Sequence, residues 1–129
     1  RERITQPERI VHRPIEALLV PPPWHRGRVL LLGDSAHPMT PYMAQGAATS
    51  IEDAAVLARC LDAVNGEDIE GAFKRYEAHR KPRTSVVQAI SSANTWMREG
   101  DGDTSWLYGY DAWNADLDQP ASKPQMKAA

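Results

Sequence analysis

The 129-residue sequence has a single cysteine, Cys60, and no long apolar run. One cysteine excludes a disulfide within the chain. The apolar runs fall well short of the roughly 20 residues that a helix needs to cross a bilayer. The formal net charge is only −2, which leaves no basic footprint for nucleic acid. The composition therefore predicts one globular unit that has neither nucleic acid nor a membrane as a partner.

Several motifs with a known chemistry are also missing. The four histidines are scattered and show no metal-ligand spacing such as H-E-x-x-H, so no metal site is predicted. Ser35 lies close to His37, but without the G-x-S-x-G pattern of a hydrolase nucleophile. No phosphate-binding Walker loop is present. Cys60 falls in an apolar helical pattern, which predicts a buried, inert thiol.

The most informative stretch runs from Gly27 to Asp53. Residues 29–32 form a continuous apolar run between two glycines, which predicts a strand buried on both faces, as in a parallel sheet. Asp34 follows at the carboxyl end of that strand, where open α/β sheets bind ligands. Its carboxylate accepts hydrogen bonds and suits a sugar or polyol hydroxyl. Gly33, which lacks a Cβ, would let a ligand approach the backbone.

A proline-stiffened loop then leads into a helix. Pro38 and Pro41 restrict the loop, and residues 45–48 read Gln-Gly-Ala-Ala. Small residues at this point allow a flat ring to approach the first helical turn. The free N–H groups and the positive dipole end of that turn would stabilise negative charge on the ring.

This stretch resembles the second flavin-binding motif of the FAD-dependent aromatic hydroxylases, the single-component flavoprotein monooxygenases. In that family a Gly-Asp dipeptide after a strand presents its carboxylate to the ribityl chain of FAD, and here that residue is Asp34. The P-x-x-x-Q-G element that follows sets backbone N–H groups against the isoalloxazine ring. The resemblance therefore implies FAD contacts from Pro41, Gly46, Ala47 and Ala48. It covers about residues 14–113 and is greatest to the 6-hydroxynicotinate 3-monooxygenase and salicylate hydroxylase type.

The resemblance also implies a fold. Family members begin with a strand–G-x-G-x-x-G–helix unit that holds the ADP part of FAD, and this sequence has no such motif. We interpret residues 1–118 as the C-terminal portion of an FAD-binding monooxygenase domain and residues 119–129 as a mobile tail. The expected fold is an α/β fragment of a Rossmann-like FAD-binding monooxygenase fold. It has one or two strands followed by two or three long helices, and it is inactive on its own.

The hydrophobic pattern places the elements. Part of residues 10–20 reads as a strand. A first helix is predicted from about Ala47 to Ala63, and a second from near Asp68, a plausible cap. Pro82 either divides the second helix in two or kinks it, and residues 106–117 form a further short helical turn. The predicted apolar face of the first helix consists of Ile51, Ala54, Ala55, Ala58 and Leu61.

Substrate contacts are less clearly indicated. Tyr42 follows Pro41 on the loop, where its phenol either bonds a substrate carboxylate or ring hydroxyl or is a packing aromatic. His37 either orients the substrate or is structural. The basic group Arg80, Lys81 and Arg83 either attracts an anion or forms a solvated face with local ion pairs. No catalytic residue is assigned.

The resemblance implies a cytoplasmic, FAD-dependent monooxygenase that uses NADH or NADPH and O₂. Its expected substrate is a small aromatic compound, a hydroxypyridine or a hydroxybenzoate-like carboxylate. The first alternative is a non-catalytic helical module that forms a homodimer without flavin, because exposed apolar faces favour self-association. The second is another flavoprotein of the same superfamily, such as an epoxidase or a reductase-like member.

Overall fold

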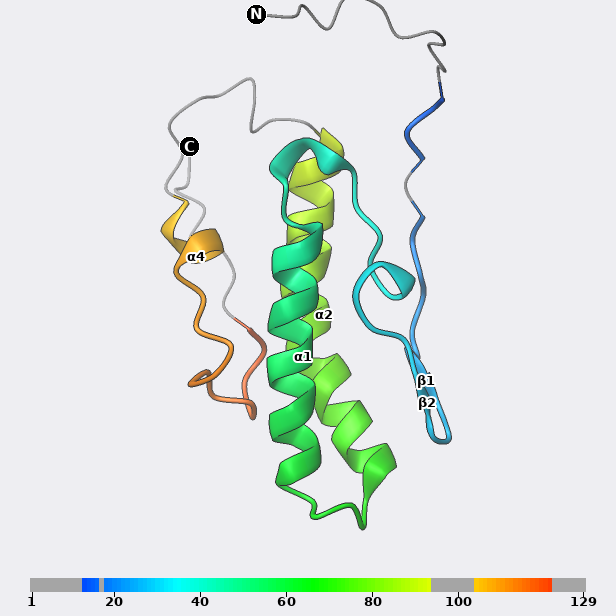
Figure 1. Cartoon of the computed structure of the whole chain (residues 1–129), viewed down its shortest axis with the longest axis vertical. Helices are drawn as coiled ribbons and strands as arrows, with labels where there is room; N and C mark the ends of the chain where they lie inside the picture. The colour runs from blue at the N-terminus through cyan, green and yellow to red at the C-terminus, as the bar shows by residue number, and fades with distance from the viewer. Residues whose placement is uncertain (1–12, 17, 94–103, 122–129) are drawn as a thin grey trace, which may run out of the picture.

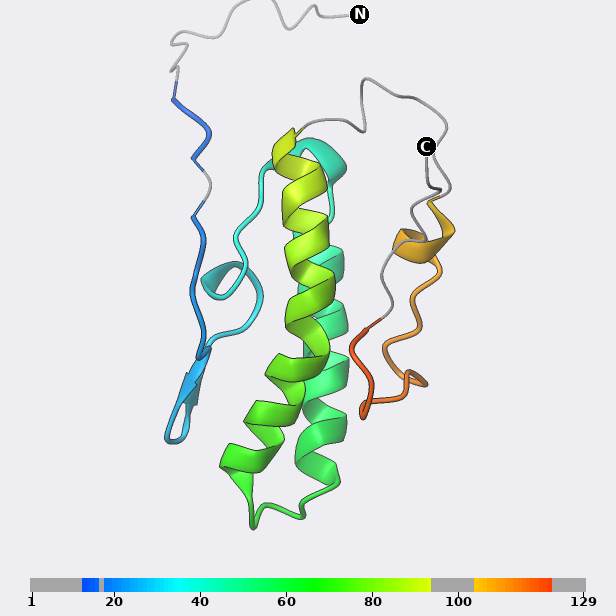
Figure 2. The same cartoon turned by 180° about the vertical axis from the view of Figure 1, so that it is seen from behind.

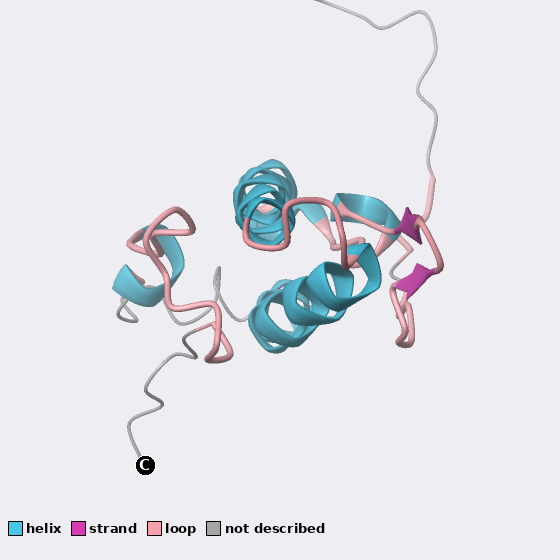
Figure 3. Ribbon diagram, turned by 90° about the horizontal axis from the view of Figure 1, so that it is seen from below, coloured by secondary structure: helices cyan, strands magenta, loops and turns pink. Residues whose placement is uncertain are grey.

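The computed structural model describes residues 13–16, 18–93 and 104–121. Two long helices, α1 (Gly46–Asp62) and α2 (Ile69–Ala93), run antiparallel side by side along the length of the molecule (Figure 1). A small β-hairpin lies against one side of this pair. The segment from residue 104 to residue 121 lies on the opposite side, as the rear view and the view from below also show (Figures 2 and 3).

The hairpin consists of β1 (His25–Arg26) and β2 (Val29–Leu30), which pair antiparallel. Gly27 makes the tight connection with φ +56°, a conformation that costs glycine little. The prediction of a doubly buried strand over residues 29–32 is wrong here, because only Val29 and Leu30 are in a strand and Val29 is 69% exposed. The apolar run fits a strand, but its only partner among the described residues is β1.

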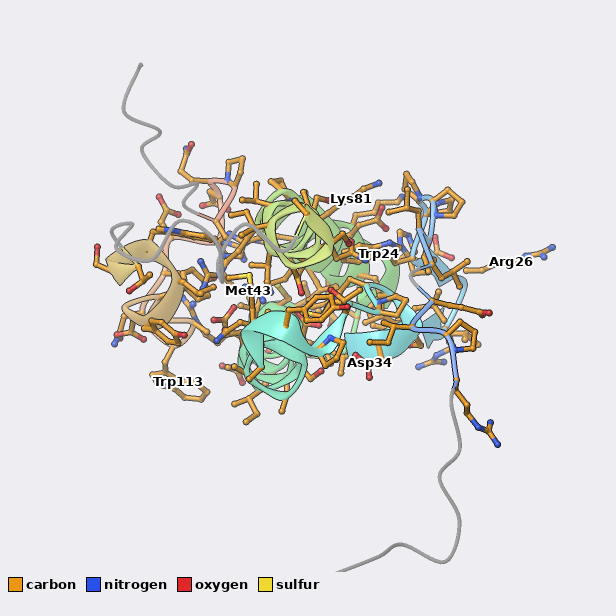
Figure 4. All side chains as sticks on the ribbon, turned by 90° about the horizontal axis from the view of Figure 1, so that it is seen from above. Trp24, Arg26, Asp34, Met43, Lys81 and Trp113 are labelled. Carbon is orange, nitrogen blue, oxygen red and sulfur yellow. The ribbon has the colours of Figure 1, made fainter. Side chains whose placement is uncertain are left out.

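The strand expected within residues 10–20 is not found in residues 13–16 and 18–20, and residues 10–12 lie outside the described ranges. Residues 18–23 lead to the hairpin without helix or strand, and Trp24 follows them. The indole of Trp24 is buried between α2 and the hairpin (Figure 4). Its backbone N–H donates to Glu77 Oε2 at 2.8 Å, which fixes the start of the hairpin on α2.

Helix α1 begins and ends within one residue of the predicted positions. The predicted buried face is wrong, since Ile51 is 71% exposed. The face that α1 turns toward α2 instead carries Thr49, Asp53, Val56 and Cys60, each fully buried. Burial raises the pKa of the Cys60 thiol, as expected for an inert cysteine.

Helix α2 is a single helix through Pro82, so the kinked alternative is the one observed. The bend is visible midway along the helix in Figure 2. Proline has no N–H for the intrahelical bond, and its ring displaces the preceding turn. Asp68 caps the helix as predicted, because its Oδ1 accepts the Gly71 N–H at 2.9 Å. None of the described helices is long and apolar enough to cross a membrane.

The chain after α2 has little regular structure apart from the short helix α4 (Ser105–Tyr108). Hydrogen bonds from a side chain hold the backbone of this segment in place instead. The Arg59 guanidinium donates to the carbonyl oxygens of Ala112 and Ala115 at 2.9 and 2.8 Å. Ala121 is buried, and its N–H donates to the His79 carbonyl at 3.0 Å. The packed structure therefore continues past residue 119, where the predicted tail begins, and residues 122–129 lie outside the described ranges.

The α/β fold class is confirmed.

Candidate functional site

The predicted Gly-Asp turn forms a 3-10 turn over Gly33–Ser35. Gly33 has φ +60°, and a Cβ at this position would lie 2.7 Å from Ser50 Oγ on α1. Glycine is therefore required by the left-handed backbone and by close packing against α1, rather than by a ligand as the sequence suggested. Ser35 closes the turn, because its hydroxyl donates to the Leu32 carbonyl and accepts the Leu32 N–H.

Asp34 projects from this turn beside the start of α1. A Cβ built on Gly46 would lie 3.7 Å from Asp34 Oδ1, so the carboxylate lies close to the first residue of the helix. Asp34 is exposed, and within the described ranges its carboxylate has no hydrogen-bond or ion-pair partner. An exposed carboxylate without a protein partner is free to accept hydrogen bonds from a ligand.

The amino end of α1 is open in the same place. Gln45 occupies the N-cap position, but its side chain makes no capping bond and is 5% exposed. Gly46 and Ala48 are half-buried and Ala47 is exposed. The first-turn N–H groups of a 17-residue helix, without a side-chain cap, retain a partial positive charge that suits an anionic ligand group. The structure thus brings Asp34 and residues 46–48 to one place.

The loop that precedes α1 is held by α2. Pro41–Met43 forms a second 3-10 turn, and Ala44 ends it in the left-handed conformation, φ 52°. The Gln88 side chain donates to the Pro38 carbonyl at 2.8 Å, and the Ser91 hydroxyl donates to the Thr40 carbonyl at 2.7 Å.

Pro41 and Tyr42 are both exposed, Tyr42 by 39%. Tyr42 is therefore available to a ligand and is not a buried packing aromatic.

His37 is not on this surface. Its side chain is fully buried beside Trp24, with 5.7 Å between ring centroids. Nε2 of His37 lies within hydrogen-bond distance of Asp53 Oδ2. Since an ionised Asp53 only accepts, the Nε2 of His37 carries the donated proton. The structure places His37 in the interior of the molecule and apart from the exposed Tyr42.

Asp53 is the centre of a buried polar network. Its Oδ1 accepts from Arg80 Nε at 2.7 Å, and its Oδ2 accepts from the Gly33 N–H at 3.1 Å as well as from His37. Burial acts to raise the pKa of Asp53. The hydrogen bond from His37 and the charge of Arg80 outweigh burial and hold that pKa below its usual range.

Glu52 extends the network to Arg83. The two carboxylate oxygens of Glu52 accept from Arg83 Nε and a terminal nitrogen, each at 2.9 Å, and Oε2 also accepts from Arg80 at 2.7 Å. Arg83 further donates to the carbonyl oxygens of Trp106 and Leu107. Arg80 and Arg83 are fully buried, so the predicted solvated face and the attraction of a free anion do not apply to them. The predicted ion pairs are present, but in the interior, with Glu52 and Asp53. Of the three basic residues, only Lys81 is partly exposed, and its Nζ lies 6.0 Å from the centroid of the Trp24 ring.

The sequence contained a signal for this network that the apolar pattern missed. Buried positions on α2 follow the helical period, and the two arginines occupy that stripe between two apolar residues: Tyr76, Arg80, Arg83 and Val87. The stripe on α1 likewise places Asp53 between Thr49 and Val56. Cations and carboxylates at core positions of neighbouring helices indicate a buried ion-pair network.

Comparison with known proteins bears directly on this arrangement. The family model described as "FAD binding domain" matches residues 12–91, which include the Gly-Asp turn, the proline loop, all of α1 and most of α2. The chain belongs to the FAD binding domain family. The predicted family resemblance is confirmed, and FAD is the cofactor that the family implies.

Similar proteins include monooxygenases of several kinds. The chain is 54% identical over 108 residues to 6-hydroxynicotinate 3-monooxygenase from Pseudomonas fluorescens, and these residues make up 84% of the chain and 27% of that enzyme. It is 49% identical over 92 residues to the enzyme of the same name from Bordetella bronchiseptica, and these residues make up 71% of the chain and 24% of that enzyme. It is 41% identical over 86 residues to kynurenine 3-monooxygenase from Stenotrophomonas maltophilia, and these residues make up 65% of the chain and 18% of that enzyme. The chain spans about a quarter or less of the length of these relatives.

Proposed function

We propose that this chain supplies the part of an FAD site that holds the ribityl chain and the flavin ring in an aromatic-ring monooxygenase. The observation that carries the proposal is the closeness of Asp34 to Gly46, which places an exposed carboxylate beside the open start of α1. The two features suit opposite parts of one ligand, because a carboxylate accepts bonds from hydroxyls and a helix start stabilises negative charge. The residues present therefore fit the cofactor.

Each site residue has a separate task in this proposal. Asp34 accepts hydrogen bonds from ribityl hydroxyls. The N–H groups of residues 46–48 would hold the pyrimidine edge of the flavin, where their fixed orientation would stabilise negative charge without reorganisation. Pro41 sets the boundary between the flavin and the substrate. When bound, FAD supplies the oxygen-transfer chemistry, with NADH or NADPH and O₂ as co-substrates.

The substrate in this proposal is a hydroxypyridine or hydroxybenzoate-like carboxylate. The support is the identity to 6-hydroxynicotinate 3-monooxygenases and to a 3-amino-4-hydroxybenzoate 2-monooxygenase from Streptomyces cremeus, the latter 36% identical over 123 residues. The exposed phenol of Tyr42 follows Pro41 and donates a hydrogen bond to the substrate. His37 is buried against Asp53, so we give it a structural task and no substrate contact.

A chimaera tests the proposal. This chain replaces the matching segment of the Pseudomonas fluorescens relative, and the purified chimaera is examined for bound flavin and for hydroxylation of 6-hydroxynicotinate. We expect a yellow protein that retains FAD and hydroxylates the ring. A folded but colourless chimaera would contradict the proposal.

Two substitutions locate the flavin contact in the chimaera. Asp34→Ala should lower FAD affinity about tenfold or more, because a hydrogen bond to a charged group contributes about 1.5–3 kcal/mol. Asp62→Ala is the matched control, since Asp62 is also exposed but lies at the far end of α1. Equal FAD affinity in the two variants would remove Asp34 from the site.

A further inference from the structure

Asp53 and the Gly33–Asp34 turn are joined by a hydrogen bond that spans two elements. The Gly33 N–H, one residue before the flavin-facing carboxylate, donates to Asp53 Oδ2 at 3.1 Å. Gly33 and Asp53 are both buried, and Asp53 is fully so. The turn is thus attached to the interior of α1 by its own backbone.

The Asp53 side chain is itself held from two directions. Arg80 Nε donates to Oδ1 at 2.7 Å, and His37 Nε2 donates to Oδ2. His37 follows the turn in sequence, and its N–H bonds back to the Gly33 carbonyl at 2.9 Å. A carboxylate that accepts from two side chains and one backbone N–H has little rotational freedom.

From this geometry we propose that Asp53 is a positioning residue for the FAD site. It fixes the Gly33–Asp34 turn so that the Asp34 carboxylate stays beside the start of α1. The inference rests on the proposed function, because it requires Asp34 to bind the cofactor. Asp53 is buried beneath the turn and does not contact the cofactor, so its effect on FAD passes through Asp34.

Asp53→Asn tests this step, because the amide keeps the shape of the side chain but replaces one acceptor oxygen with a donor. Either the Gly33 N–H or the Arg80 Nε–H then faces an NH₂ group, and in both orientations the Gly33 N–H loses its hydrogen bond to a charged oxygen. Hydrogen exchange of the Gly33 amide, measured without flavin, should accelerate at least about tenfold relative to the Thr49 amide, since an opened amide loses its protection. Thr49 N–H bonds to the Gln45 carbonyl within α1 and serves as the internal reference.

A double-mutant cycle with Asp34→Ala separates positioning from general damage to the fold. FAD affinity is measured for wild type, each single variant and the double variant. Asp53→Asn alone should weaken FAD binding about tenfold, and by less than about twofold when Asp34 is already alanine. Val56→Ala is the control for lost stability, since Val56 is fully buried one turn further along α1. It should lower stability and leave FAD affinity within about twofold of wild type.

The outcomes are distinct. Equal losses of affinity in both backgrounds, or unchanged exchange of the Gly33 amide, would overturn the positioning role while leaving the FAD site intact. If wild type and Asp34→Ala bind FAD equally, the proposed function fails and this inference fails with it. If Asp53→Asn does not fold, Asp53→Glu enters the same cycle. It keeps the charge for Arg80 and displaces the oxygen that accepts the Gly33 N–H, and the same two results decide.

Discussion

Asp34 Oδ1 lies 3.7 Å from the position that a Cβ of Gly46 would occupy, although the two residues are separated by a loop that contains two prolines. The loop between them is attached to α2 through Gln88 and Ser91. A turn and a helix start that are close only through tertiary packing form one surface. This surface is the basis of the proposed cofactor site.

Gly33→Ala should be much more destabilising than Gly27→Ala. Both glycines have φ near +60°, which costs a residue with a Cβ about 1–2 kcal/mol. At Gly27 nothing lies within 4 Å of an added Cβ, whereas at Gly33 the Ser50 hydroxyl lies 2.7 Å away. We expect an additional loss of about 1–3 kcal/mol at Gly33 from overpacking, measured by denaturant unfolding. Equal losses at the two positions would show that α1 does not press on the turn.

Glu52→Gln should remove about 3 kcal/mol of folding free energy, because it leaves Arg80 and Arg83 buried with only part of their compensating charge. Asp118→Asn is the control. The Arg75–Asp118 pair has the same 2.7 Å separation as the Arg80–Glu52 pair, but the Asp118 side chain is 77% exposed. Such surface pairs contribute about 0–1 kcal/mol. Urea denaturation compares the two variants, and similar midpoints would contradict a buried ion-pair network.

Folding stability should fall as the pH drops below about 6.5, the pKa of histidine in the unfolded chain. Burial lowers the pKa of His79 even though its ring bonds the Gln119 carbonyl. The folded state therefore binds the proton less readily than the unfolded chain. The contribution of His79 to stability is complete above the unfolded pKa of about 6.5 and is lost as pH falls through the folded pKa. His79→Gln should flatten this part of the stability–pH curve, and an unchanged slope would exclude His79 as the source.

Tyr42→Phe should raise the substrate KM of the chimaera more than it changes FAD retention. The substitution removes only a hydroxyl from a side chain that is 39% exposed on the loop after Pro41. Loss of one hydrogen bond to an ionised group raises KM about tenfold or more. Steady-state kinetics with 6-hydroxynicotinate, alongside the flavin-to-protein absorbance ratio, separates the two effects. Kinetics identical to those of the unmodified chimaera would exclude Tyr42 from the substrate pocket.

Local patterns in the sequence predicted the parts of the fold that depend on local interactions. The bounds of α1, the Asp68 cap and the burial of Cys60 are confirmed, since capping residues and helical periodicity act within a few residues. Pro82 left two outcomes open locally. Packing of α2 along α1 favours the single bent helix over two separate ones.

The features that the sequence did not predict depend on partners distant in the chain. Ile51 is apolar but exposed, while Arg80 and Arg83 are charged but buried, because Glu52 and Asp53 compensate them across the helix pair. Hydrophobicity alone cannot identify a polar core stripe. The structure places Asp34 close to Gly46, while the interior position of His37 follows only from its pairing with Asp53. The flavin contacts and the homodimer stay predictions.

Titration of the ¹⁵N-labelled chain with FAD, followed by NMR, tests the central claim most directly. We predict that the largest shifts fall on the backbone amides of residues 46–48 and on Asp34, and that Asp34→Ala reduces them while Asp62→Ala does not. Shifts confined to other surfaces would contradict a flavin site at the meeting point of this turn and this helix.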